Sequence, residues 1–270
     1  MERPDFNIVF VGAGNVASCL APALMQKGCR IVQVYSRTQE SAQTLARKAD
    51  CPYTTDLTQI SGEADLYIVS VKDDALDDVT ARLACSGNPD ALYAHTAGSM
   101  PMDVWKGKIR RYGVLYPMQT FSKQRAVDFS AVPFFIEANS EEDACLLKEV
   151  AGRVSPKIYE ASSEQRRYLH IAAVFACNFT NHMYTLCDRL LAAHGLPFES
   201  MLPLIDETAR KIHELPPLEA QTGPARRNDR NVIGRHLDIL KKEAPELADL
   251  YGMISRSIHT YELNNKMTSK

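Results

Sequence analysis

The segment VGAGNVA at residues 11–17 constrains the fold of this chain more than any other part of the sequence. It follows an apolar run at residues 7–11 and opens a segment, residues 16–27, whose apolar side chains recur at helical spacing. In its G-x-G-x-x-A pattern, the first glycine permits a tight turn, the second lets the backbone approach a pyrophosphate, and the alanine lets helix and sheet pack closely. Free N–H groups at the start of the helix then bind the anion. We therefore predict that a dinucleotide contacts the residues of this turn, which are Gly12, Gly14, Asn15, Val16 and Ala17.

The first 160 residues alternate between short apolar runs and amphipathic segments, as in a parallel sheet covered by helices on both faces. The predicted strands are at residues 7–11, 30–35, 66–71, 91–94, 114–116 and 134–137. The predicted helices are at residues 16–27, 38–49, 74–84 and 141–153. Because crossovers between parallel strands are right-handed, this order predicts a doubly wound α/β fold, a Rossmann domain over residues 1–160.

The pattern changes near residue 160, beyond which we predict only helices. Residues 164–194 form one long predicted helix, apolar nearly all round between residues 169 and 179. A helix of this kind is buried centrally or shared with a partner subunit. Further helices are predicted at residues 198–214, 232–244 and 245–266. We expect an all-helical domain over residues 161–270, which binds substrate and forms a homodimer.

The composition is that of an ordinary globular protein, with 45% hydrophobic residues, 24% charged residues and a net charge of −2. The near-neutral charge argues against a nucleic-acid partner, and no apolar run is long enough for a membrane span or a secretory signal. The seven cysteines lack metal-ligand spacing and are typical of reduced thiols. We expect a cytoplasmic protein without a metal site.

The end of the second predicted strand indicates which dinucleotide is bound. An NAD site usually places a carboxylate there to bind the ribose hydroxyls. This chain has Ser36 and Arg37 instead, and both donate hydrogen bonds that suit a 2′-phosphate. We predict NADP as the cofactor. The alternative is that Arg37 is only a solvated residue before the next helix.

Two further strand ends lie at the same edge of the predicted sheet, where ligands bind in doubly wound folds. They are predicted to give the remaining cofactor contacts, from Ser70, Val71, Lys72 and Thr96. His95 and Ser99 are expected beside the substrate, together with Gln119 at the next strand end. His95 is a candidate proton donor because histidine titrates near neutral pH. A hydrogen-bonded structural role is the alternative for a lone histidine.

Polar residues interrupt the long apolar helix, and a buried polar group needs a partner, which a substrate can supply. His170 and Asn178 are the candidates for catalysis, with core hydrogen bonding or a dimer contact as the alternative, which we favour for His182. In the loop at residues 222–229, Arg226 and Arg227 offer donors for a carboxylate or phosphate. We predict substrate binding by Arg227; an exposed loop before a helix is the alternative.

Together these segments resemble the 6-phosphogluconate-dehydrogenase-like superfamily, which includes pyrroline-5-carboxylate reductase, 3-hydroxyisobutyrate dehydrogenase and ketopantoate reductase. HTAGS at 95–99, YPMQTF at 116–121, HIAAVFACNF at 170–179 and TGPARRND at 222–229 are similar to motifs of a branch described as NADP oxidoreductases. That branch joins a Rossmann-like domain to a C-terminal domain of unknown function. The resemblance implies NADP binding and a dimer formed by the helical domains.

One position departs from the hydroxyacid dehydrogenases of the superfamily. They place a lysine one turn before an asparagine on the first long helix of the second domain. If Asn178 corresponds to that asparagine, Val174 occupies the lysine's position. The resemblance therefore names no substrate.

The sequence predicts an NADP-dependent oxidoreductase. It would transfer a hydride between NADPH and a small carbonyl or imine substrate bound between the domains, with His95, His170 and Asn178 as catalytic residues. One alternative is a non-catalytic NADP-binding sensor or regulatory module, which the missing lysine favours. Another is an NADPH:flavin or NADPH:deazaflavin oxidoreductase, which would share the same Rossmann half.

Overall fold

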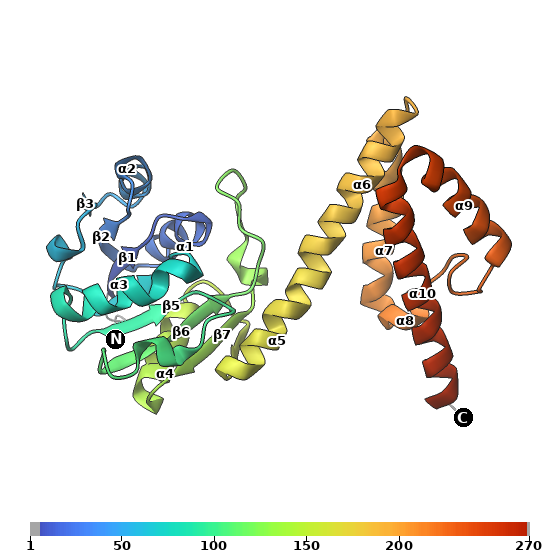
Figure 1. The fold of residues 1–270 in the computed structure, drawn as a ribbon. Helices are drawn as coiled ribbons and strands as arrows, with labels where there is room; N and C mark the ends of the chain where they lie inside the picture. Colours follow the sequence, from blue (N-terminus) through green and yellow to red (C-terminus); the bar gives the residue numbers. More distant parts are fainter. Residues whose placement is uncertain (1–5, 269–270) are drawn as a thin grey trace. The chain divides into compact units, whose positions relative to one another are not determined.

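The computed structural model describes residues 6–268, and the chain divides into two compact units between His182 and Met183. The first unit contains the sheet and its helices (Figure 1), and the second is entirely helical. The α/β fold with a helical C-terminal region that the sequence predicts is confirmed.

The first unit is built on one sheet of eight strands in the order β3-β2-β1-β4-β5-β6-β7-β8. All neighbouring pairs are parallel except β6 with β7. The order reverses between β1 and β4, so the carboxyl ends of these two strands form the ligand crevice typical of this fold. The strands are β1 Asn7–Val11, β2 Arg30–Tyr35, β3 Tyr53–Thr54, β4 Leu66–Val69, β5 Leu92–His95, β6 Arg111–Pro117, β7 Phe134–Ala138 and β8 Ile158–Glu160.

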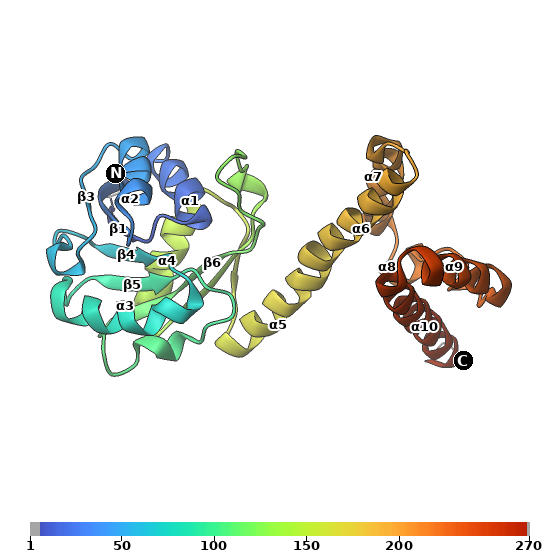
Figure 2. The same cartoon turned by 45° about the horizontal axis from the view of Figure 1, so that its top comes forward.

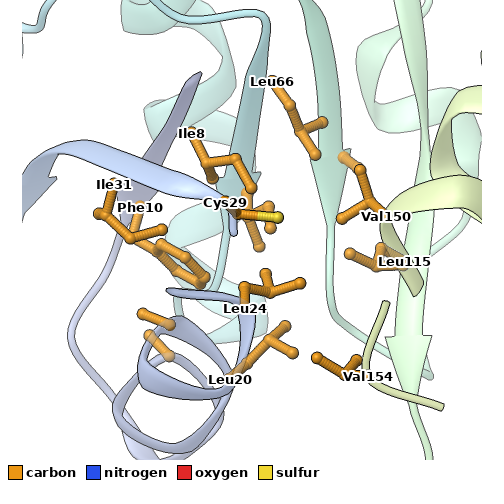
Figure 3. Packing of buried hydrophobic residues seen from close by; sticks show 14 of the residues in the cluster. Ile8, Phe10, Leu20, Leu24, Cys29, Ile31, Leu66, Leu115, Val150 and Val154 are labelled. Atoms are coloured by element: carbon orange, nitrogen blue, oxygen red, sulfur yellow. The ribbon is translucent and has the colours of Figure 1, made fainter. Parts of the chain in front are cut away.

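Helices cover both faces of the sheet, as Figures 1 and 2 show. Phe10 of β1 belongs to the hydrophobic layer shared with α1, α2 and α4, whereas its neighbour Val11 belongs to the layer shared with α3. This alternation follows from the period of two residues along a strand. The helices are α1 Asn15–Met25, α2 Gln39–Lys48, α3 Asp73–Ser86 and α4 Glu141–Gly152. Figure 3 shows the first layer with these residues labelled: Ile8, Phe10, Leu20, Leu24, Cys29, Ile31, Leu66, Leu115, Val150 and Val154.

All six predicted strands are present, but the sequence analysis missed β3 and β8, which have two and three residues. Segments so short carry no recognisable periodicity. The predicted strand at residues 66–71 ends at Val69, so Ser70 and Val71 lie in the loop at the carboxyl edge of the sheet.

The long predicted helix is present as α5 Ser163–Ala173, a π-helical turn over Val174–Phe179, and α6 Thr180–Ala193. The second unit adds α7 Leu202–Glu214, α8 Pro217–Ala220, α9 Arg230–Glu243 and α10 Pro245–Thr268. Of these, the sequence analysis missed the one-turn α8. The last strand ends at Glu160, where we expected the helical part to begin, although the compact units divide about 20 residues later. The division into domains at residue 160 stays a prediction. Within residues 6–268, no helix is long and apolar enough to span a membrane.

Candidate functional site

The turn between β1 and α1 can be made only by glycine at its first position. Gly12 has a φ of +110°, and a Cβ atom built on it would lie 2.2 Å from the carbonyl oxygen of Ser70. Its N–H donates to the carbonyl of Tyr35 at 2.8 Å, which holds the turn against β2. The close approach of β1 to the residues after β4 therefore depends on the absence of a side chain at Gly12.

The N-terminus of α1 has the features of an anion-binding site. Its N-cap residue, Gly14, offers no side-chain cap, and the first turn contains no acidic residue. The nearest atom to a Cβ built on Gly14 is the Ser70 oxygen at 3.9 Å, so the space above the turn is open. Uncapped N–H groups and the positive end of the helix dipole favour a phosphate here. Ala17, fully buried in the core, lets the helix approach the sheet as predicted.

A crevice of about 330 Å³ opens at these strand ends. Its lining residues carry the positive charges of Arg37, Lys72 and Lys123 and include no carboxylate. Such a surface fits the polyanionic backbone of a dinucleotide. The lining residues are Gly12, Ala13, Gly14, Tyr35, Ser36, Arg37, Thr38, Ser41, Ser70, Val71, Lys72, Ala75, Val79 and Lys123.

Seven of the predicted cofactor residues line this crevice, namely Gly12, Gly14, Ser36, Arg37, Ser70, Val71 and Lys72. Asn15, Val16, Ala17 and Thr96 do not. The side chain of Asn15 instead donates from Nδ2 to the carbonyl of Phe121 at 3.0 Å. Thr96 is buried, and its N–H donates to the carbonyl of Val69 at 3.0 Å, so its backbone extends the pairing of β4 with β5.

Lys123 and Ser41 also line the crevice, and the sequence analysis did not identify them. Ser41 lies in the first turn of α2, where a hydroxyl is a possible phosphate ligand by its position alone. Lys123 is distant in sequence from the other lining residues, so no local pattern points to it.

His95 ends β5 in the interior of the sheet and is fully buried. Its Nδ1 accepts from the N–H of Ala97 at 3.2 Å, and its ring stacks on Trp105. Burial, reinforced by the nearby positive charge of Arg166, lowers the pKa of His95 to about 3. A histidine held neutral in this way is a poor proton donor near neutral pH, so the structure argues for the structural alternative.

A tyrosine–histidine pair lies at the carboxyl edge of the sheet. The hydroxyl of Tyr116, near the end of β6, is 3.5 Å from Nδ1 of His170 on α5. Gly98 packs against the phenol, because a Cβ there would lie 2.7 Å from Cζ of Tyr116. Burial raises the pKa of Tyr116, so the phenol stays protonated at neutral pH. The pair therefore couples a protonated hydroxyl to a partly exposed imidazole.

Arg166 fixes α5, and with it His170, against the sheet. Its side chain is fully buried and forms an ion pair with Glu137 at 2.6 Å. It also donates to the carbonyl of Met100 at 3.1 Å and to Oγ of Ser163 at 2.9 Å. These contacts tie the start of α5 to β7 and to the segment after β5. The sequence analysis missed Arg166, because an arginine on a helix is usually solvated.

The remaining predicted substrate residues have different surroundings. Ser99 donates a hydrogen bond from its hydroxyl to a carboxylate oxygen of Asp73, the first residue of α3. Gln119 is exposed, and its Oε1 accepts from the N–H of Thr120 at 2.8 Å. Neither contact excludes a ligand, but each occupies part of the side chain's hydrogen-bonding capacity.

Asn178 and Arg227 belong to different compact units. Asn178 is exposed on the π-helical turn, a distortion that is frequent at functional sites. Arg227 is exposed in the second unit. Its neighbour Arg226 forms an ion pair with Glu262 at 3.1 Å and donates to the carbonyl of Gln221 at 2.7 Å, so Arg226 has a structural role.

Two family models match the chain. Residues 7–92 match a family described as "NADP oxidoreductase coenzyme F420-dependent", and residues 132–258 match a "domain of unknown function", DUF2520. A search of curated proteins finds no match.

Solved structures resemble the whole chain. A Bacteroides fragilis protein described as a "putative NADP oxidoreductase" is 58% identical, with a TM-score of 0.90 over 95% of this chain and 98% of that one. A Thermotoga maritima protein shares 23% identity, with a TM-score of 0.69 over 94% of this chain and 99% of that one. A pyrroline-5-carboxylate reductase from Coxiella burnetii shares 18% identity, with a TM-score of 0.58 over 97% of this chain and 98% of that one. The last two show the fold alone. The first, together with the two family models, shows that this chain belongs to the NADP oxidoreductases that join an F420-dependent-type oxidoreductase domain to a DUF2520 domain.

Proposed function

We propose that this protein is an NADPH-dependent oxidoreductase that transfers a hydride to a small carbonyl or imine substrate. One observation favours NADPH over NADH: Ser36 and Arg37, directly after β2, line the crevice, and none of its lining residues is acidic. A guanidinium and a hydroxyl suit a 2′-phosphate, and there is no carboxylate to repel it.

Arg37 allows a direct test of this preference. Wild type is expected to bind NADPH more tightly than NADH, and Arg37→Ala to lose about tenfold in NADPH affinity while its NADH affinity changes little. Isothermal titration with each nucleotide measures both affinities. Equal binding of the two by wild type would contradict the assignment.

The residues around the crevice fit a nicotinamide dinucleotide, because the turn at Gly12 and the uncapped start of α1 leave room and free donors for its pyrophosphate. When bound, the reduced nicotinamide supplies the hydride. The protein's own part is to orient the substrate and to donate a proton. We assign the proton to the pair of Tyr116 and His170, because its phenol is protonated and its imidazole is partly exposed, whereas His95 is held neutral in the core.

The substrate would lie beside Gly98 and Tyr116, at the carboxyl edge of the sheet. Asn178 stays proposed as a further substrate contact, and the substrate role of Arg227, which belongs to the other compact unit, stays a prediction from the sequence. With a panel of small aldehydes, ketones and cyclic imines, wild type is expected to oxidise NADPH with at least one compound. The loss of absorbance at 340 nm measures this oxidation. If wild type binds NADPH tightly and oxidises it with no compound, a sensor that binds NADP without turnover explains the site better.

A flavin or deazaflavin substrate is a second candidate, because the family model over residues 7–92 names coenzyme F420. Reduction of F420 or of a flavin by NADPH, followed in the visible spectrum, separates this reaction from carbonyl or imine reduction. A flavin or deazaflavin that is reduced where the whole carbonyl and imine panel fails would favour this second candidate.

We also propose a homodimer formed by the helical part of the chain. Large apolar side chains are exposed there, including Phe175 at 64%, Leu204 at 62% and Met253 at 61%. So many exposed apolar groups indicate a surface that a partner covers. Light scattering should show twice the mass of one chain. A monomer at micromolar concentration would contradict the proposal.

A further inference from the structure

Lys123 lines the cofactor crevice from a loop that lies far along the chain. The other lining residues come from the end of β2 and from the segments that directly follow β1, β2 and β4. Lys123 is in the loop at residues 118–127, which follows β6 and stands beside α1 in both overall views (Figures 1 and 2). Its side chain is exposed and forms no ion pair with any residue in the described range 6–268.

This loop is attached to the same helix whose start faces the crevice. Asn15 Nδ2 donates to the carbonyl of Phe121 at 3.0 Å, and the thiol of Cys19 donates to the carbonyl of Ser122 at 3.6 Å. Asn15 and Cys19 are one turn apart and therefore share a face of α1. The two residues before Lys123 are thus held against the first two turns of α1.

The base of the loop is also fixed. The ring of Phe121 stacks on Phe129 with centroids 5.9 Å apart, and it packs against the buried layer under α1. The N–H of Met118 donates to the carbonyl of Pro133 at 2.9 Å. The backbone that leads into the hydrogen bond to Asn15 is therefore anchored to the folded core.

Lys123 therefore lines the same crevice as Gly14, the N-cap residue of α1, which offers no side-chain cap. We propose that the ammonium of Lys123 binds the pyrophosphate of the dinucleotide, and that Asn15 is a positioning residue that holds the loop in place. Arg37, at the end of β2, binds the 2′-phosphate instead, so the two cations have separate phosphates. The proposal rests on the nucleotide site of the proposed function and adds a contact that the G-x-G-x-x-A pattern does not contain.

Comparing the binding of NADPH and NADH distinguishes the role of Lys123 from that of Arg37. Because NADPH and NADH share the pyrophosphate, Lys123→Ala should weaken both by the same factor, about tenfold, whereas Arg37→Ala should weaken NADPH alone. Lys123→Arg should retain most of the affinity. The matched control is Arg125→Ala, which removes an exposed cation of the same loop that does not line the crevice and should bind like wild type.

The positioning role of Asn15 is tested by a double-mutant cycle. Asn15→Ala should weaken binding of both nucleotides, and its effect should shrink when Lys123 is already alanine. Thermal unfolding of each variant checks that the fold is intact. Additive effects of the two substitutions would refute the positioning role.

The remaining outcomes distinguish an incorrect contact of Lys123 from an incorrect nucleotide site. If Lys123→Ala binds both nucleotides like Arg125→Ala, Lys123 does not contact the cofactor. If only NADPH binding weakens, Lys123 contacts the 2′-phosphate and the pyrophosphate assignment is wrong. If wild type binds neither nucleotide, the proposed function fails together with this inference.

Discussion

The phenol oxygen of Tyr116 lies 3.5 Å from Nδ1 of His170, and this contact joins the end of β6 to α5 across 54 residues of sequence. Tyr116 is almost completely buried, whereas His170 is partly exposed. A proton that leaves the phenol can therefore be replaced through an imidazole that reaches solvent. This arrangement is the basis of the first prediction.

Tyr116→Phe should lower kcat by about 10²-fold to 10⁴-fold with the carbonyl or imine compound that wild type reduces fastest, because it removes the proposed proton donor and keeps the ring. NADPH affinity should not change. The control is Tyr159→Phe, since Tyr159 is 52% exposed and packs on the same Phe135. Equal kcat for wild type and Tyr116→Phe would exclude the phenol as the donor.

His95 should make the protein less stable in acid. Its pKa is about 3 in the folded state, below the value near 6.5 of an unfolded chain, so between these values the unfolded state binds more protons. The contribution of His95 is complete above pH 6.5 and is lost as the pH falls towards 3, by on the order of 1 kcal/mol per pH unit.

Urea unfolding at pH 7, 6, 5 and 4 measures this effect. His95→Gln should cost stability at pH 7, and its difference from wild type should shrink as the pH falls. His213→Gln, at an exposed position of α7, controls for general acid effects. A difference between wild type and His95→Gln that stays constant over this range would show that His95 does not titrate as described.

Removing one partner of the buried ion pair between Arg166 and Glu137 should lower the free energy of unfolding substantially. Arg166→Met leaves a carboxylate that is 17% exposed without its partner, and should cost about 3 kcal/mol of unfolding free energy. The double change with Glu137→Gln should recover part of that loss. Arg110→Ala breaks the exposed pair with Asp90 and should cost less than about 1 kcal/mol. Similar losses at the two pairs, in denaturant titrations, would contradict this.

Substitutions of Gly12 and Gly14, the two glycines of the G-x-G-x-x-A pattern, should have different effects. Gly12→Ala forces a Cβ to within 2.2 Å of the Ser70 carbonyl at a φ of +110°, so it should lower the melting temperature. Gly14→Ala meets nothing closer than 3.9 Å and has a φ of −77°, so it should fold normally and lose NADPH affinity by obstructing the pyrophosphate. A Gly14→Ala variant that binds NADPH like wild type would show that the turn does not approach the nucleotide.

The sequence alone predicted seven of the residues that line the crevice at the carboxyl ends of β1, β2 and β4. Gly12, Gly14, Ser36 and Arg37 lie within the first β-α-β unit, so residues close in sequence are close in space. Local periodicity also placed most helices and strands correctly, since both depend on short-range backbone geometry.

Only the tertiary structure decided which polar residues face the site. From the sequence, His95 and His170 are both candidate proton donors. In the structure, His95 is buried within the sheet, whereas His170 contacts Tyr116 at the edge of the sheet. Lys123 joins the crevice only because α1 holds a loop that begins about 100 residues later. Such contacts are set by how strands pair and helices pack, and a side chain's burial, pKa and partners follow from that packing and not from its neighbours in sequence.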